Sequence, residues 1–535
     1  MQRALYLLVV IGAGGCFNPS ASDSGDPATS TVSTSGTAGT AETLETTAEP
    51  PGPTTSIGPG STTMVDTTAP ASTATGSTTD DPATEAAETT AEPQPGCGMF
   101  TPGTDLNVCT ATYLGAAGDD RAHAVIIAPS GAIHVAGLFP GHDFGANVVD
   151  GAGDGAVLQL TLDGAAVNTV TRFPSAVLDI DIERSVGRIA VAGAFGAAGL
   201  NGDGTIAWTA SNFAAARVAI GEDGTTAAID ETQVHLLNSE GTPITIFSIP
   251  DVTLSDVALA PEPASVILTA TRTGVPLMPC TFYSMPGLGA FAYDSTPLWQ
   301  AYNFSAEQAA AAGVCGVSRA GRVNIGADGH VYYTGTSDAA DSVHARDPLN
   351  IAFVAAANVA TDPYNTPGNL DPLAQIGYYA RFDAVNGKHL AGQFVLARDT
   401  EKSMPDAAKG TTLLPLEATA AADGRVFVAG DAAFALADRD MRTVDGMPVG
   451  AHIDNEPFVM VVSPDLKTRL AWSPFTAGGP GQVTGIHVGA QHAAMLASQT
   501  VAELTLGQLL TVDALQPEPG LLGEGYLAVF PILPD

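Results

Sequence analysis

Short runs of apolar residues, each preceded by a tight turn, recur along most of this chain. One run, Ile133–Ala136, follows Ser130-Gly131 and ends at Gly137, and similar phrases begin near residues 186, 328 and 423. Looser copies begin near residues 223, 263 and 489. Asp-Gly and Asn-Gly dipeptides, which favour hairpin turns, stand between many of the runs. The pattern predicts many short antiparallel strands and hardly any helix.

The composition of the runs indicates how these strands pack. In Ile189–Ala192 and Val426–Ala429 both faces are apolar. A sheet with one face in water would alternate apolar and polar residues, whereas a sheet between two neighbouring sheets would not. A second strand follows each core phrase, as at Gly155–Leu162, and leads through a polar turn to a last one. Four strands per repeat predict an all-β fold, a β-propeller of about seven four-stranded blades.

The first repeat carries a resemblance to a known family. The stretch Tyr113-Leu114-Gly115, continuing through Asp119-Asp120 to Gly137, resembles the bacterial seven-bladed β-propeller repeat family (SBBP). That family has a Tyr-Leu-Gly-Gly-x-Gly-Asp-Asp-like opening and an Asp-x-x-Gly-Asn-Val-Tyr-Val-x-Gly-like core. The resemblance implies the fold for about residues 110 to 535 and transfers no catalytic motif. In the family Tyr-Leu-Gly ends an outer strand, so we expect residues 110–114 to complete the last blade by pairing with 526–532.

The first residues predict an export signal. Arg3 precedes the apolar stretch Ala4–Ile11, which is too short to span a bilayer, and small residues then lead to Cys16. This resembles a bacterial lipoprotein signal, which implies cleavage after residue 15 and a lipid on Cys16. Ala13 stands where Leu is usual, and the alternative is an ordinary secretory signal. Phe17 replaces the Asp that would favour the inner membrane, so we expect an exported, outer-membrane lipoprotein of the bacterial cell envelope.

Residues 16–95 have a different composition from the rest of the chain. Ser, Thr, Ala, Pro and acidic residues dominate, and no aromatic residue occurs between Phe17 and Phe100. Such a segment cannot bury enough apolar surface to offset the entropy of ordering it. We therefore expect a disordered linker with an r.m.s. span of roughly 50 Å, between the signal peptide (1–15) and a propeller domain (96–535).

Net charge limits the classes of partner. The chain carries a formal charge of −36 and has only four lysines. Nucleic acid and anionic lipid surfaces both require a basic face, so we expect no nucleic-acid partner. Contact with the membrane would come through the N-terminal lipid, and we expect a monomer.

Four further cysteines suit an exported protein. Three pairings of Cys97, Cys109, Cys280 and Cys315 are possible. Proximity in sequence favours Cys97–Cys109 and Cys280–Cys315, each bridge contributing about 2–4 kcal/mol. Metal binding is the alternative, and the absence of a Cys-x-x-Cys spacing argues against it.

Searches for catalytic and cofactor motifs find none. The chain has no Gly-x-Ser-x-Gly, His-Glu-x-x-His, phosphate loop or complete calcium loop. Asp150–Gly155 and Asn201–Gly204 weakly suggest calcium, although turn chemistry explains them better. Aligning the repeats on their turns places four polar residues at the start of the innermost strands, as candidates for a ring at one channel mouth: His123, Asp179, Asp256 and Gln482. The alternative is that any propeller channel is wet and polar.

These observations favour a binding or scaffold lipoprotein whose propeller recognises a protein or a glycan. One alternative is a propeller enzyme of the hydrolase, lyase or lactonase type with a site at the channel mouth, and another is a structural envelope component. Fold alone does not decide among them. The stretch from Ser337 to Gln375 is the longest interruption between strands of a repeat, and we expect partner contacts there.

Overall fold

The computed structural model describes most of the chain beyond residue 97. The described ranges are 98–115, 118–272, 284–314, 316–337, 342–355, 359–361, 376–395, 413–432, 438–453, 455–520 and 522–533. The predicted signal peptide, Cys16 and the predicted linker all lie outside these ranges.

Seven antiparallel sheets of four or five strands make up the folded unit. Each sheet is given from its innermost strand outward. The first sheet contains β3 (Arg121–Ile127), β4 (Ile133–Leu138), β6 (Gly155–Leu160), β7 (Val167–Phe173) and β5 (Asn147–Gly151), and the second contains β8 (Val177–Ile182), β9 (Ile189–Gly193), β10 (Gly196–Leu200) and β11 (Ile206–Ala210). The third sheet contains β12 (Arg217–Ile220), β13 (Thr226–Ile229), β14 (Val234–Leu237) and β15 (Pro243–Phe247). The next two are β16 (Thr253–Ala260), β17 (Ser265–Arg272), β18 (Met285–Phe291), β19 (Pro297–Ala301); and β20 (Ser318–Ile325), β21 (Val331–Ser337), β25 (Ile376–Phe382), β26 (His389–Val395) with β24 (Val359–Thr361). The last two are β27 (Leu413–Ala420), β28 (Val426–Ala432), β31 (Glu456–Val462), β32 (Arg469–Pro474); and β33 (Gln482–Val488), β34 (His492–Gln499), β35 (Glu524–Pro531), β2 (Thr110–Leu114).

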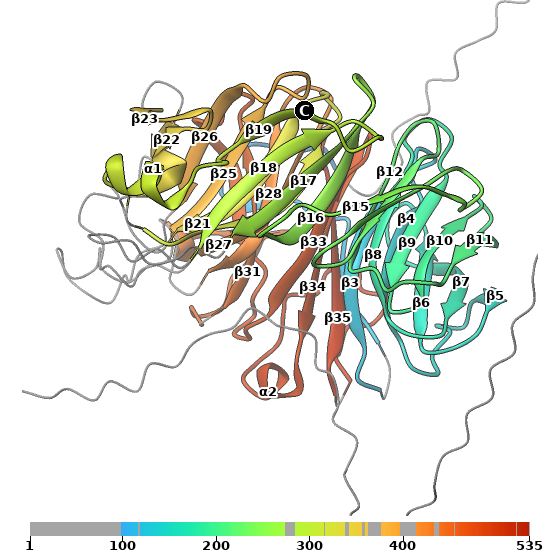
Figure 1. Ribbon diagram of the computed structural model, residues 1–535. Helices are drawn as coiled ribbons and strands as arrows, with labels where there is room; N and C mark the ends of the chain where they lie inside the picture. The colour runs from blue at the N-terminus through green and yellow to red at the C-terminus, as the bar shows by residue number, and fades with distance from the viewer. Residues whose placement is uncertain are drawn as a thin grey trace, which may run out of the picture. The chain divides into compact units, whose positions relative to one another are not determined.

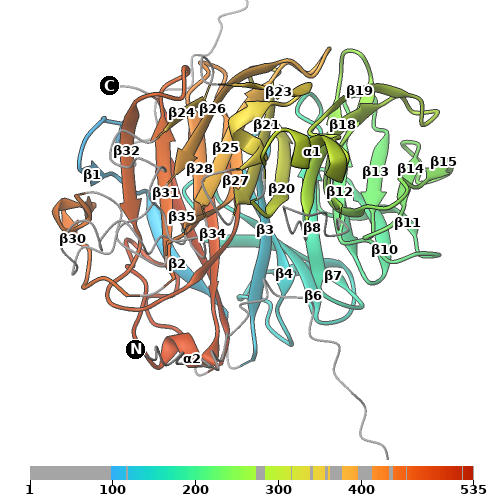
Figure 2. The ribbon, with the colours of Figure 1, turned by 60° about the vertical axis from the view of Figure 1, so that its left-hand side comes forward.

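The innermost strands neighbour one another in chain order and close into a ring. Contacts run from β3 through β8, β12, β16, β20 and β27 to β33, and β33 returns to β3. Figure 2 shows the sheets following one another around this ring. The expectation of an all-β propeller with four-stranded blades is confirmed.

The structure contains several strands that the prediction of about seven four-stranded blades did not include. An eighth sheet of three strands joins β1 (Asp105–Leu106), β29 (Thr443–Val444) and β30 (Met447–Pro448), and β22 (Arg346–Asp347) pairs with β23 (Asn350–Val354). Two sheets carry a fifth, parallel strand, β5 or β24. These elements lie in connections that the repeats do not share, so a repeat pattern carried no signal for them.

Helices are few in the described part of the chain. They are α1 (Ala306–Ala311), α2 (Val501–Leu504) and the short 3-10 turns η1 (Val343–Ala345) and η4 (Arg439–Met441). Ser305 and Thr500 cap α1 and α2 with reciprocal capping boxes. Among the described residues no helix has the length and apolar character needed to cross a membrane.

The ring closes through the strand expected from the sequence. β2 pairs antiparallel with β35, with Thr110 opposite Val529 and Leu114 opposite Gly525. The hydroxyl of Tyr113 in β2 donates to Gln499 Oε1 at 2.8 Å and accepts from the backbone N–H of Leu509 at 2.7 Å. The N-terminal strand therefore completes a C-terminal blade and covers its open edge.

Packing between blades explains why both faces of the core strands are apolar. Every residue of β9 is buried, as is every residue of β10 and β13. Ala190 and Ala192 belong to the same core cluster as Val218 of the next blade. Val191, on the other face of β9, belongs to a cluster with residues of the preceding blade. Small residues at these positions allow neighbouring sheets to approach closely.

Deleting residues 97–114 removes β2 and exposes the buried edge of β35. Because Ala111, Tyr113 and Leu114 are fully buried, we expect a loss of several kcal/mol and a fall in Tm of about 5–10 °C. Differential scanning calorimetry measures this. Deleting residues 20–90 is the control and should leave Tm unchanged, and an unchanged Tm for the 97–114 deletion would disprove closure by β2.

Candidate functional site

Five charged residues alternate in sign along the inner strands of five consecutive blades. We call them the charge ring: Asp179 on β8, Arg217 on β12, Asp256 on β16, Arg322 on β20 and Glu417 on β27. The corresponding positions on β3 and β33 are the small residues Ala124 and Gly485. Each arginine thus stands between two carboxylates, and the two remaining positions have almost no side chain.

An irregularity near the start of the inner strands sets this column. The pairing register shifts at a bulge in β3, β8, β16, β20, β27 and β33. Asp179, Asp256 and Glu417 each resume pairing directly after the extra residue. A bulge reorients the next side chain, and here it presents a carboxylate to the channel.

One oxygen of each carboxylate is bound to the backbone of the next blade. The N–H of Val218 donates to Asp179 at 2.9 Å, that of Val323 to Asp256 at 2.8 Å, and that of Ile486 to Glu417 at 3.1 Å. These N–H groups lie at the inner edge of a blade, where no further strand of the same sheet can accept from them. The carboxylates accept in place of such a strand, so the buried N–H groups have hydrogen-bond partners. The carboxylates therefore connect consecutive blades.

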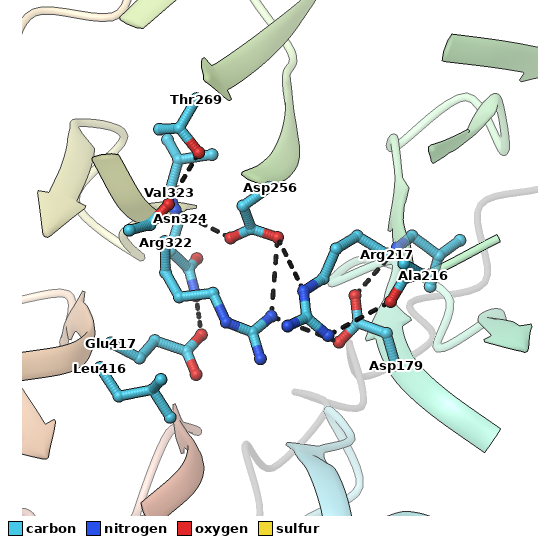
Figure 3. A network of polar contacts seen from close by, with 12 residues as sticks. Asp179, Ala216, Arg217, Asp256, Thr269, Arg322, Val323, Asn324, Leu416 and Glu417 are labelled. Carbon is cyan, nitrogen blue, oxygen red and sulfur yellow. Dashed lines mark hydrogen bonds and ion pairs between the residues drawn. The ribbon is translucent and has the colours of Figure 1, made fainter. Parts of the chain in front are cut away.

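The second oxygen of each carboxylate faces the channel (Figure 3). Arg322 Nη1 lies 3.6 Å from Asp256 Oδ1 and 3.8 Å from Asp179 Oδ1, and Arg217 Nε lies 3.8 Å from Asp256 Oδ1. Glu417 Oε1 accepts a 3.3 Å hydrogen bond from the side-chain amide of Asn324. These arginine–carboxylate separations are longer than those of direct charge-assisted hydrogen bonds.

Burial dominates the acidity of these groups. Desolvation raises the pKa of Glu417 to about 7, against the lowering effect of Arg322. Burial likewise raises the pKa of Asp256, although Arg322 and Arg217 both favour its charged form. Burial and the charge of Arg322 lower the pKa of Arg217, whereas the surrounding carboxylates outweigh burial and raise the pKa of Arg322. Glu417 is thus a ring carboxyl whose pKa lies near neutral pH.

Four of the five charge-ring residues, all but Arg217, line a cavity of about 230 Å³ inside the channel. Its wall includes Ala124, Asp179, Asp256, Arg322, Glu417 and Thr484. A second cavity of about 420 Å³ has a mainly apolar wall and shares Arg184 and His487 with the first. The channel therefore changes from charged to apolar along its length.

The structure brings together two of the four residues predicted for a channel-mouth ring. Asp179 and Asp256 belong to the charge ring. His123 is the extra residue of the bulge in β3, and Gln482 is exposed three residues before Gly485. The loops that follow the inner strands differ in length: the loop between Ile182 and Ile189 is one residue longer than that between Ile127 and Ile133, and that between Val488 and Ala493 is shorter than both. An alignment of the turns without gaps therefore displaced these two residues from the column.

The same alignment missed Arg217, Arg322 and Glu417. Counting back from the apolar end of each inner strand would have found them, because each is the third residue before the strand's last residue. The signal is a charged residue followed by Val-Ala-Ile, Val-Asn-Ile or Ala-Thr-Ala.

The structure describes one of the four predicted disulfide cysteines and both of the predicted calcium-like turns. Cys109 is buried and disulfide-bonded, while Cys97, Cys280 and Cys315 lie outside the described residues, so the pairings stay predictions. The carboxylate of Asp203 accepts from the backbone and hydroxyl of Thr205, and both oxygens of Asp150 accept backbone N–H groups. The contacts of Asp203 are those of a turn residue, whereas Asp150 also binds the backbone of Ile206 in the neighbouring blade. Among the described residues no group of three His, Cys, Asp or Glu side chains is placed to hold a metal.

Comparison with known proteins adds little beyond the fold. No protein-family model matches the chain, and no curated protein matches it. The crystal structure of the β-propeller domain of Cps50 (Swd1) from Myceliophteria thermophila is 8% identical, with a TM-score of 0.41, and the match covers 78% of this chain and 99% of that one. The resemblance to the SBBP family therefore stays a prediction.

Glu417 gives the folded protein a specific pH dependence. Its folded pKa of about 7 lies above the model-compound value of 4.5, so the folded state binds a proton that the unfolded state releases. This contribution is present below about pH 4.5 and is lost as pH rises through about 7, by no more than about 3 kcal/mol. Urea unfolding at several pH values should therefore show less loss of stability between about pH 4.5 and 7 in Glu417→Gln than in the wild type. Parallel pH profiles for the two proteins would refute the assignment.

Proposed function

We propose that this protein is a binding module, tethered to the bacterial envelope by a lipid on Cys16, whose propeller recognises a protein partner. The observation that carries the proposal is an exposed apolar hairpin, β22–β23. Leu349, Phe353 and Val354 are exposed, with Phe353 and Val354 at 62% and 60%. Exposed apolar clusters on an otherwise acidic, soluble domain are typical of protein-interaction sites.

The hairpin is held firmly enough to present these side chains. The N–H of Tyr302 donates to Pro348 O at 2.7 Å, and Arg346 Nη2 donates to Ala312 O at 2.9 Å. Ile351 is buried against the sheet beside α1, where Figure 1 also places β22 and β23. A fixed backbone lowers the entropy cost of binding, which favours a preorganised contact surface.

The first described residues of the folded unit lie at the other end of the strands from the hairpin. The N–H of Phe100 donates to Leu533 O, just after the end of β35. The hairpin lies in the connection between β21 and β25, at the opposite ends of the strands. It also falls within the stretch 337–375 expected to carry partner contacts, of which residues 342–355 and 359–361 are described.

The enzyme alternative is less well supported by the geometry. A catalytic carboxylate needs an oxygen free for substrate or water. In the charge ring each carboxylate accepts a backbone N–H of the next blade with one oxygen, and its second oxygen lies beside Arg322 or Asn324. Both oxygens thus have protein partners, as in a structural group. The raised pKa of Glu417 is the observation that keeps a hydrolase as a second candidate.

Replacing Phe353 and Val354 by Asp should abolish capture of the partner from native envelope extracts. Loss of two exposed apolar anchors typically costs more than about 2 kcal/mol, or more than about thirtyfold in affinity. Quantitative pull-down with the full chain measures this, and a Cys16→Ser form should move from the membrane fraction to the soluble fraction.

Val385→Asp is the matched control, since Val385 is also 60% exposed but lies in the turn between β25 and β26. Equal loss of capture in this control, or full capture by the hairpin variant, would contradict a binding role for β22–β23.

A further inference from the structure

The second cavity of the channel lies where the inner strands end. Its volume is about 420 Å³, and its wall includes the buried side chains of Ile127, Ile182 and Val488, the last residues of β3, β8 and β33. Ile532 and Leu533, which follow β35, also line it, and Leu533 is exposed at the rim. A concave space of this size with a mainly apolar wall is typical of a small-molecule site.

Small residues after the inner strands leave this space open. Ala128, Ala327 and Ala421 stand within two residues of the ends of β3, β20 and β27, and Gly489 directly follows β33. A Cβ on Gly489 would lie 2.7 Å from Ile127 Cγ2, so the connection after β33 lies directly against the first blade. Larger side chains at these positions would fill the end of the channel to the density of the blade interiors. The opening is therefore built into the sequences of four blades.

One polar side chain places a hydrogen-bond donor beside this apolar space. His487 is only 8% exposed and lines both cavities, and its Nδ1 accepts the backbone N–H of Ile127 at 3.1 Å. Burial, together with the charge of Arg184, lowers the pKa of His487 to about 3, so the ring is neutral near pH 7. A neutral imidazole that accepts at Nδ1 carries its proton on Nε2. Within the described part of the chain no atom accepts a hydrogen bond from Nε2.

The charges around the two cavities favour a neutral occupant over an ion. In the wall of the apolar cavity Arg425 Nε lies 2.7 Å from Asp423 Oδ2, and Arg184 donates to the carbonyl oxygen of Ile325. The adjoining cavity is lined by five carboxylates and two arginines, so its charge repels an anion. A cation would lose its hydration to an apolar wall whose one carboxylate is already paired.

We propose that the cavity at this end of the channel binds a small neutral molecule with an apolar body and one carbonyl oxygen, which accepts a hydrogen bond from His487 Nε2. The apolar body lies against Ile127, Ile182 and Val488, and the carbonyl faces the charged part of the channel. Burial of the body supplies most of the affinity, and the hydrogen bond fixes the orientation of the ligand. This small-molecule site is additional to the protein-binding role proposed for the hairpin.

Ligand-observed NMR titration of the full chain with acetophenone and 2-phenylpropene tests the hydrogen bond. The two probes have nearly the same shape, but a methylene group replaces the carbonyl oxygen in the second. In His487→Asn the amide oxygen can still accept the N–H of Ile127, whereas the donor at Nε2 is lost. We expect this variant to bind acetophenone roughly three- to tenfold more weakly than the wild type, and 2-phenylpropene within about twofold of it. Absence of saturable acetophenone binding to the wild type, or an equal change for both probes, would overturn the proposal.

Two exposed alanines provide a matched pair that tests the position of the site. Ala490 lines the cavity from the turn between β33 and β34, whereas Ala165 lies in the turn between β6 and β7. Ala490→Trp should abolish binding of both probes by filling the cavity, and Ala165→Trp should bind them like the wild type. Undiminished binding by Ala490→Trp would contradict the proposal, and this pair still decides if His487→Asn does not fold. Phe353 and Val354 do not line this cavity, so partner capture and probe binding can fail independently.

Discussion

The ring of blades depends on how its innermost strands meet at the channel. Each inner strand has a partner on only one side within its own sheet, so its remaining backbone amides point toward a neighbouring blade. Asp179, Asp256 and Glu417 accept hydrogen bonds from those amides, and His487 Nδ1 accepts one from Ile127 across the closing junction. Buried carboxylates are costly unless they are hydrogen-bonded and paired with charge, and here both conditions are met. The arginines between them supply the charge, which makes the five-residue ring a consequence of closing the propeller.

This arrangement gives the protein two kinds of surface with different demands. The channel is small, charged and shaped by bulges that recur from blade to blade. The β22–β23 hairpin is apolar and exposed, and it belongs to a connection that no other blade repeats. A rigid repeat scaffold that presents irregular connections is a common way to place binding residues. The hairpin and the channel therefore belong to separate parts of the fold.

Repetition made the architecture predictable from the sequence, but it concealed the charge ring. Apolar strands with Gly-containing turns identify blades, and Tyr113-Leu114 without a preceding repeat identified the closing strand, because both signals are local. The ring depends on where each strand's bulge falls, and an extra residue shifts the column without leaving a mark in the apolar pattern. The same single-residue bulge occurs in β3, β8, β16, β27 and β33, so it does not separate Asp179 and Asp256, which were found, from Glu417, which was missed. The loops between the first and second strands differ in length from blade to blade, and an alignment of the turns cannot allow for that. Arg322 lies inside a wider irregularity of β20, and β12 has no register shift at Arg217. The β1–β29–β30 sheet joins segments far apart in the chain, which a repeat pattern cannot pair.

A double-mutant cycle on Asp256 and Arg322 tests most directly whether the charge ring is one electrostatic unit. Asn at position 256 can still accept from the Val323 amide, so the cycle isolates the charge interaction from the backbone bond. Urea unfolding of the wild type, Asp256→Asn, Arg322→Gln and the double variant gives the coupling energy. We predict that the double variant is more stable than the sum of the single losses by at least about 1 kcal/mol. Additive losses, within about 0.5 kcal/mol, would contradict the account.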